Sequence, residues 1–80
     1  MQLENHILYF KPTCPYCVKV LSFMRNAGIE MDKRDTWDAA NAAELVAIGG
    51  KQQVPCLVID GKALYESEDI IAYLRGKVAG

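Results

Sequence analysis

The sequence lacks the features that would assign it to several broad classes of protein. It has one histidine, three cysteines, no run of like charges and a formal net charge of −1. A nucleic-acid-binding domain carries a basic patch, so we expect no nucleic-acid partner. No apolar stretch approaches the roughly 20 residues that span a bilayer, and the first five residues do not resemble a secretory signal. We therefore expect a cytoplasmic protein with no membrane partner.

The short length and the few cysteines further limit the possible domain organisation and chemistry of the protein. Eighty residues suffice for one compact core, so we expect a single domain over residues 1–80 that acts as a monomer. Cysteines in a reducing compartment do not form a structural disulfide framework. An odd number of cysteines, two of them close together, instead indicates redox chemistry or metal binding.

Apolar runs interrupted by Gly and Pro predict four strands. Residues 6–10 and 56–59 are almost wholly apolar, which is typical of strands buried on both faces. Residues 29–33 alternate between apolar and polar, as a half-exposed edge strand does. An Asp-Gly pair after the second apolar run predicts a tight turn, so residues 62–65 should return as an antiparallel strand.

Three helices are predicted between and after these strands. The first covers residues 15–27, begins with a proline and is stopped by the glycine that follows it. The second covers residues 38–48, with Asp35 or Thr36 as its cap. The last begins with Ser67 as its N-cap. Its buried stripe is expected to comprise Ile70, Ile71, Leu74 and Val78.

The resulting element order, β-α-β-α-β-β-α, predicts the fold class. The first two strands are joined by a helix and should be parallel, whereas the last two should form an antiparallel hairpin. We therefore predict an α/β protein with a four-stranded mixed sheet flanked by three helices, which is a thioredoxin-like fold.

A Cys-Pro-Tyr-Cys motif at residues 14–17 lies where the first strand gives way to a helix. The free N–H groups and the dipole of a helix N-terminus stabilise negative charge, and a thiol placed there has a lowered pKa. Lys11, three residues earlier, adds a cation. We therefore expect Cys14 to be the attacking thiolate and Cys17, one helical turn further and more buried, to be the resolving thiol.

Two other interpretations of the cysteines compete with this one. In the first interpretation, both thiols are unreactive residues of the hydrophobic core. A strand-to-helix turn, however, is not where unreactive cysteines are usually found. A zinc site generally needs four ligands, and beyond this pair only His6 and Cys56 are available, both on strands that we expect to be buried. We therefore predict no metal site, and we expect Cys56 to be an unreactive core thiol.

The motif at residues 14–17, followed by Val54 and Pro55 before the second apolar strand, resembles the dithiol glutaredoxin family across essentially the whole chain. The resemblance implies a glutathione-dependent thiol–disulfide oxidoreductase that reduces protein disulfides and protein–glutathione mixed disulfides, with glutathione as the reductant. It also implies a cis bond between Val54 and Pro55, which would let the backbone of Val54 pair with an extended peptide.

Glutathione carries a carboxylate at each end, so its receptor needs cationic or N–H-rich groups on both sides of the thiolate. We assign the glycine carboxylate to Lys11 together with Lys51 or Gln52. Tyr16 borders the glutathione site in the family that the motif resembles. The γ-glutamyl end is assigned to the N-terminus of the last helix, where backbone N–H groups can bind an anion. The residues expected there are Ser67, Glu68 and Asp69.

The segment before the last helix departs from the usual glutaredoxin pattern, in which a Gly-Gly pair precedes a small residue and an aspartate. Here Glu66 and Ser67 are similar to the Glu-Ser pair in the N-terminal domain of glutathione S-transferases, which binds the γ-glutamyl moiety. Both patterns place glutathione in the same groove. They leave open which of Ser67, Glu68 and Asp69 contacts it.

Two other functions stay open on the sequence. One is a glutaredoxin-like redoxin that is reduced by thioredoxin reductase. The other is a binding module in which the first cysteine and glutathione hold an iron–sulfur cluster, although Pro15 should disfavour this by stiffening the turn. A transferase is disfavoured, because its electrophile pocket needs a helical second domain for which 80 residues leave no room.

Overall fold

The computed structural model describes residues 1–79. Its elements follow the predicted order β-α-β-α-β-β-α. They are strand β1 (Gln2–Phe10), helix α1 (Pro15–Ala27), strand β2 (Glu30–Asp35), helix α2 (Ala39–Gly49), strand β3 (Cys56–Ile59), strand β4 (Lys62–Tyr65) and helix α3 (Ser67–Ala79).

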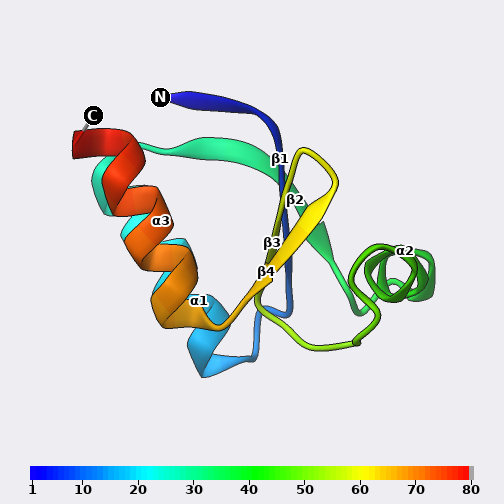
Figure 1. The fold of residues 1–80 in the computed structure, drawn as a ribbon. Coiled ribbons are helices and arrows are strands. Elements are labelled where there is room, and N and C mark those ends of the chain that lie inside the picture. The colour runs from blue at the N-terminus through cyan, green and yellow to red at the C-terminus, as the bar shows by residue number, and fades with distance from the viewer. Residues whose placement is uncertain (80) are drawn as a thin grey trace.

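The four strands form one mixed sheet in the order β2-β1-β3-β4. Strand β1 pairs with β2 in parallel, and β3 runs antiparallel to both β1 and β4. Helices α1 and α3 lie side by side on one face of the sheet and α2 lies on the other (Figure 1). This arrangement is the predicted thioredoxin-like fold.

Each face of the sheet has its own hydrophobic core. The core under α1 and α3 comprises Leu8, Val20, Met24, Ile29, Met31, Leu57, Ile70, Ile71 and Leu74. The core under α2 comprises Tyr9, Leu45, Cys56 and Val58. Successive residues of a strand point to opposite faces, so the central strands β1 and β3 supply both cores. This explains why their sequences are nearly unbroken apolar runs.

Strand β1 starts at Gln2, four residues before the start that the sequence predicts. Gln2 pairs with Glu30, and an irregularity in register separates this pair from the regular pairing that begins at Ile7. Asn5 lies in this interval with a positive φ of 60°. The early part of the strand is polar and largely exposed, so apolar periodicity could not reveal it.

The predicted cap of α2 was wrong. Asp38 is the N-cap, and its carboxylate accepts a hydrogen bond from the backbone N–H two residues later. Asp35 instead accepts a hydrogen bond from the backbone N–H of Trp37. Thr36 is buried. Both predicted caps therefore belong to the turn that leads into the helix.

Helix α3 differs from its prediction at both ends. Ser67 is its first residue and not its N-cap, because the carbonyl of Glu66 accepts the hydrogen bond from the N–H of Ile70. Val78 was expected in the buried stripe, but its side chain is 40% exposed. The buried stripe therefore ends at Leu74.

Candidate active site

Cys14 is the residue at which the chain turns from the loop after β1 into α1. It is the N-cap of this helix, with extended backbone angles, and Pro15 follows as the first helical residue. Its backbone N–H bonds the carbonyl of Lys11, which closes the turn. Cys14 is half-buried and Cys17 is fully buried, and both are free thiols.

The pKa of Cys14 lies below the ordinary value for a thiol. Partial burial of its sulfur is the largest single effect, and it opposes ionisation. Hydrogen bonds from the backbone and thiol of Cys17 and from the backbone of Tyr16, together with the charge of Lys11, outweigh it. The first turn of the helix therefore stabilises a thiolate at this position.

Cys17 has the opposite tendency. Burial raises the pKa of its thiol to about 12, and the neighbouring Cys14 contributes to the same shift. Its sulfur lies 3.5 Å from the backbone nitrogen of Lys11. A thiol with this pKa stays protonated at neutral pH and can donate a hydrogen bond to the Cys14 thiolate. The two cysteines thus have different chemical states, although they are only three residues apart.

The step between Val54 and Pro55 faces the first cysteine. Their peptide bond is cis, as the resemblance implies. The sulfur of Cys14 lies 4.0 Å from the carbonyl oxygen of Val54. Pro55 itself is buried. Two segments that are 40 residues apart in the sequence therefore meet at the thiol.

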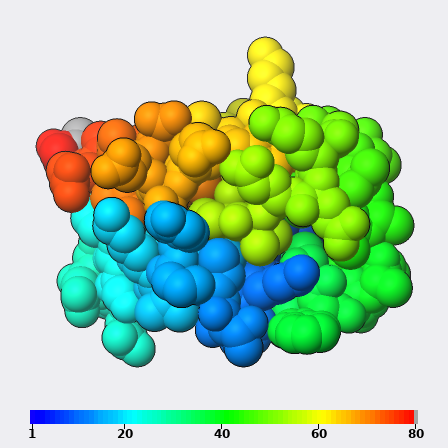
Figure 2. Space-filling model, turned by 90° about the horizontal axis from the view of Figure 1, so that it is seen from below, coloured from blue at the N-terminus to red at the C-terminus, as the bar shows by residue number. Residues whose placement is uncertain are grey.

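A groove of about 560 Å³ adjoins this step, and we call it the α3-side groove. Its volume lies in the range of small-molecule sites in proteins. It is lined by Tyr16, Lys19, Gln53, Val54, Pro55, Glu66, Ser67 and Glu68. Figure 2 looks onto this face, where the start of α1 (blue), the segment before β3 (yellow-green) and the start of α3 (orange) come together.

A second groove of about 670 Å³, which we call the α2-side groove, opens towards α2. It is lined by Lys11, Thr36, Trp37, Ala39, Ala42, Ala43, Val46 and Gln52. In Figure 2 the loop after β1 (blue), the segment before β3 (yellow-green) and the green α2 region surround a hollow. Lys11 reaches across part of it, with its ammonium 5.7 Å from the centre of the Trp37 ring.

Most of the residues proposed from the sequence line a groove beside Cys14, but they are divided between two grooves. Those that line the α3-side groove are Tyr16, Val54, Pro55, Ser67 and Glu68. Lys11 and Gln52 line the α2-side groove. Lys51 lines neither, and its ammonium lies 4.6 Å from the centre of the Tyr65 ring. Asp69 also lines neither groove.

Two residues of the α3-side groove were missed in the sequence. Lys19 lies three residues after Tyr16 on α1, so helical spacing alone would have placed both on one side of the helix. Gln53 precedes Val54, and its side-chain amide donates a hydrogen bond to Glu66 at 3.2 Å. Glu66 itself has a positive φ of 73° at the start of α3.

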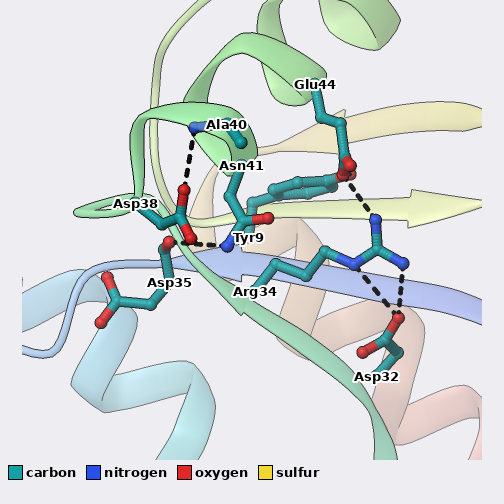
Figure 3. Close-up of polar contacts among 8 residues, drawn as sticks. All are labelled: Tyr9, Asp32, Arg34, Asp35, Asp38, Ala40, Asn41 and Glu44. Atoms are coloured by element: carbon teal, nitrogen blue, oxygen red, sulfur yellow. Dashed lines mark hydrogen bonds and ion pairs between the residues drawn. The ribbon is translucent and has the colours of Figure 1, made fainter.

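Helix α2, the wall of the second groove, is tied to the sheet by a chain of polar contacts (Figure 3). The hydroxyl of Tyr9 donates to the carboxylate of Glu44 at 2.8 Å. Arg34 pairs with Glu44 and also with Asp32. Burial, together with the bond to Glu44, raises the pKa of Tyr9 to about 12. These contacts fix α2 against β1 and β2.

Residues 1–79 contain neither a cluster of metal-ligating side chains nor a helix able to span a membrane. No group of three or more His, Cys, Asp or Glu side chains in this part of the chain is placed to hold a metal ion. Over the same residues, every helix is too short or too polar to cross a membrane.

Taken together, the fold and the paired cysteines define a thioredoxin-like protein with a candidate dithiol redox site. The chain belongs to the family described as glutathione S-transferase, N-terminal domain, whose sequence model matches residues 8–80.

The curated relatives of the chain include several glutaredoxins. It is 36% identical over 80 residues to Glutaredoxin-C4 of Arabidopsis thaliana, a match that covers 91% of this chain and 58% of that protein. It is 27% identical over 71 residues to Glutaredoxin 3 of Escherichia coli strain K12, a match that covers 88% and 86%. The chain thus spans little more than half the length of the first relative. Both resemblances inferred from the sequence are confirmed.

Solved structures give the same fold. A mutant of the thioredoxin-like protein BC3987 matches with a TM-score of 0.74 and 26% identity, over 91% of this chain and 97% of that one. The buckwheat glutaredoxin–glutathione complex matches with a TM-score of 0.71 and 22% identity, over 94% and 73%. At this identity the second match concerns the fold alone.

Proposed function

We propose that the protein is a glutathione-dependent thiol–disulfide oxidoreductase that reduces protein disulfides and protein–glutathione mixed disulfides. The observation that carries the proposal is the pairing of Cys14, half-exposed with a lowered pKa, with Cys17, buried with a raised pKa. Homology to glutaredoxins supports the same class of activity. A reducing compartment rich in glutathione, such as the cytoplasm, suits this chemistry.

The reaction begins when the Cys14 thiolate attacks one sulfur of a substrate disulfide. A new S–S bond forms between Cys14 and that sulfur, and the other sulfur leaves as a thiolate and takes up a proton. When the attacked sulfur belongs to glutathione, a second glutathione resolves the mixed disulfide, which forms oxidised glutathione and restores Cys14.

A protein disulfide needs the second cysteine. Cys17 loses its proton, attacks the Cys14 sulfur of the mixed disulfide and releases the reduced substrate, which leaves a Cys14–Cys17 disulfide. Two glutathione molecules then supply the two electrons that reduce this bond. The raised pKa of Cys17 keeps it protonated until a mixed disulfide forms, so Cys14 alone meets the substrate.

Glutathione would bind across both grooves. The N–H groups at the start of α3 suit the γ-glutamyl carboxylate, and the carboxylates of Glu66 and Glu68 suit its ammonium. The backbone of Val54 would pair with the cysteine of the tripeptide. Lys11 and Gln52, at the border of the α2-side groove, suit the glycine carboxylate.

The reduction of a glutathionylated protein by glutathione, coupled to glutathione reductase, tests the proposal. Cys14→Ser should abolish turnover, because it removes the nucleophile. Cys17→Ser should retain it, because glutathione resolves the mixed disulfide. An active Cys14→Ser protein would refute the proposal, as would turnover with thioredoxin reductase and none with glutathione. Visible absorption after anaerobic purification would instead indicate an iron–sulfur cluster.

A further inference from the structure

The α2-side groove has a chemistry that glutathione alone does not explain. Among the described residues that line it, Lys11 is the only one that carries a charge. The α3-side groove, by contrast, contains Lys19 together with Glu66 and Glu68. A groove with charges of both signs suits a zwitterionic ligand. A groove with a single cation at its edge and neutral side chains elsewhere suits an apolar ligand.

Apolar side chains are accessible along the part of this groove that Trp37 and α2 form. Trp37 is 68% exposed, and Val46 is 42% exposed. Ala39, Ala43 and Val46 recur at the spacing that places residues on one side of a helix. The alanines are small, so the groove between Trp37 and Val46 can receive side chains from a bound segment. Helix α2 is fixed to the sheet through Tyr9 and Glu44.

The groove also continues beyond the place where glutathione ends. In the proposed binding mode, the glycine carboxylate meets Lys11 and Gln52 at the border of the α2-side groove. The groove extends from these residues to Val46 on α2, with a volume of about 670 Å³. A glycine leaves most of that volume empty, whereas a polypeptide that continues past the cysteine would fill it.

We propose that the α2-side groove binds the residues that follow the reactive cysteine of a protein substrate and favours apolar side chains there. The inference rests on the proposed thiol–disulfide activity and names the class of substrate. The step it concerns is an exchange. The Cys14 thiolate attacks the substrate's cysteine sulfur in a mixed disulfide with glutathione, a Cys14–substrate S–S bond forms, and glutathione leaves as a thiolate. No external reductant is needed.

An equilibrium measurement tests this without depending on turnover. The Cys17→Ser variant is converted to a Cys14 mixed disulfide with a short peptide, and glutathione is titrated until it displaces the peptide. Two peptides are compared, one with leucines and one with serines at the two positions after a cysteine-glycine step. Partial burial of the leucines should favour that peptide about ten-fold.

Substitutions in the Cys17→Ser background locate the preference. Trp37→Ala and Val46→Lys should each bring the ratio of the two exchange constants close to one. Val78→Lys is the matched control, because Val78 is 40% exposed, lies on α3 and lines neither groove. It should leave the preference intact.

The inference would be overturned by the absence of a preference in the parent protein, by a preference that survives both groove substitutions, or by one that Val78→Lys also abolishes. A dimer in sedimentation that Val46→Lys dissociates would also overturn it, since the groove would then be an interface between two copies. Failure of the proposed function gives a different result from failure of this inference. Turnover with glutathione would then be absent, while the ratio of the exchange constants for the two peptides would still show the preference.

Discussion

The sulfur of Cys14 lies 4.0 Å from the carbonyl oxygen of Val54, although 40 residues separate them in the sequence. Strands β1 and β3 produce this proximity. Tyr9, near the end of β1, pairs with Cys56, the first residue of β3. The loop that leaves β1 and the segment that enters β3 therefore meet at one edge of the sheet, and the candidate site is built from both.

Glu68 and Asp69 differ in their relation to the α3-side groove, and this predicts different effects on glutathione. Glu68 lines the groove and Asp69 does not. Glu68→Gln should raise the KM for glutathione several-fold, because it removes a partner for the γ-glutamyl ammonium. Asp69→Asn, which removes the same charge one residue further along α3, should change KM little. Steady-state kinetics on both variants would decide, and the reverse order would contradict the assignment.

The hydroxyl of Tyr9 links β1 to α2 through Glu44. Tyr9→Phe should lower the free energy of unfolding by about 1–2 kcal/mol, since a hydrogen bond to a charged group is lost. Tyr16→Phe is a suitable control, because this side chain is largely exposed; its effect should stay within about 0.5 kcal/mol. Urea unfolding of both variants measures the difference. Equal stabilities would show that the contact contributes nothing.

Two glycines should respond oppositely to alanine. A Cβ on Gly49 would overlap the hydroxyl oxygen of Tyr65 and lie 3.1 Å from the Cβ of Ala63. Gly49→Ala should therefore cost about 1–3 kcal/mol of stability through overpacking. A Cβ on Gly76, inside α3, meets nothing within 4 Å. Gly76→Ala should stabilise the protein by about 0.5–1 kcal/mol. Thermal unfolding compares the two, and a neutral Gly49→Ala would mean that Tyr65 moves freely.

The pKa shifts of Cys14 and Cys17 have opposite signs and predict opposite effects of pH on stability. The folded-state pKa of Cys14 is lowered, so its contribution is present above the unfolded thiol pKa of about 8.5 and is lost as pH falls through the folded value. The pKa of Cys17 is raised to about 12, so its contribution is present below about 8.5 and lost as pH rises through about 12.

Under reducing conditions, the free energy of unfolding should therefore rise with pH up to about 8.5 through Cys14 and decline above it through Cys17, with a contribution of the same sign from Cys56, whose pKa burial also raises. Denaturant titrations over this range measure both. Cys14→Ser should remove the rise and Cys17→Ser should weaken the decline. A rise that persists in Cys14→Ser would assign it to another group.

Much of the fold was predictable because its signals are local. The central strands are buried on both faces, so their sequences are apolar throughout. The motif at residues 14–17 and the Val54–Pro55 pair carry the family resemblance. The number of residues between them is what a helix, a strand and a second helix require. Such patterns can be recognised in the sequence because each depends only on residues a few positions apart.

What the sequence could not predict depends on distant contacts. Asp35, Thr36 and Asp38 are all competent helix caps, and only the turn around Trp37 decides which one is used. Lys51 has the charge to bind a carboxylate, but its ammonium lies over the ring of Tyr65 on β4, 14 residues further along the chain. The α2-side groove joins residues from three segments, so no local pattern indicates it.

Measurement of the pKa of Cys14 tests most directly whether this residue is the attacking thiolate. The rate of alkylation of each cysteine by iodoacetamide, followed by mass spectrometry across a pH series, reports the thiolate fraction of each. We expect Cys14 to react with a midpoint below the ordinary thiol pKa of about 8.5. Cys17 and Cys56 should stay unmodified at neutral pH, because burial raises the pKa of both thiols. A Cys14 midpoint equal to that of a free thiol would contradict this assignment.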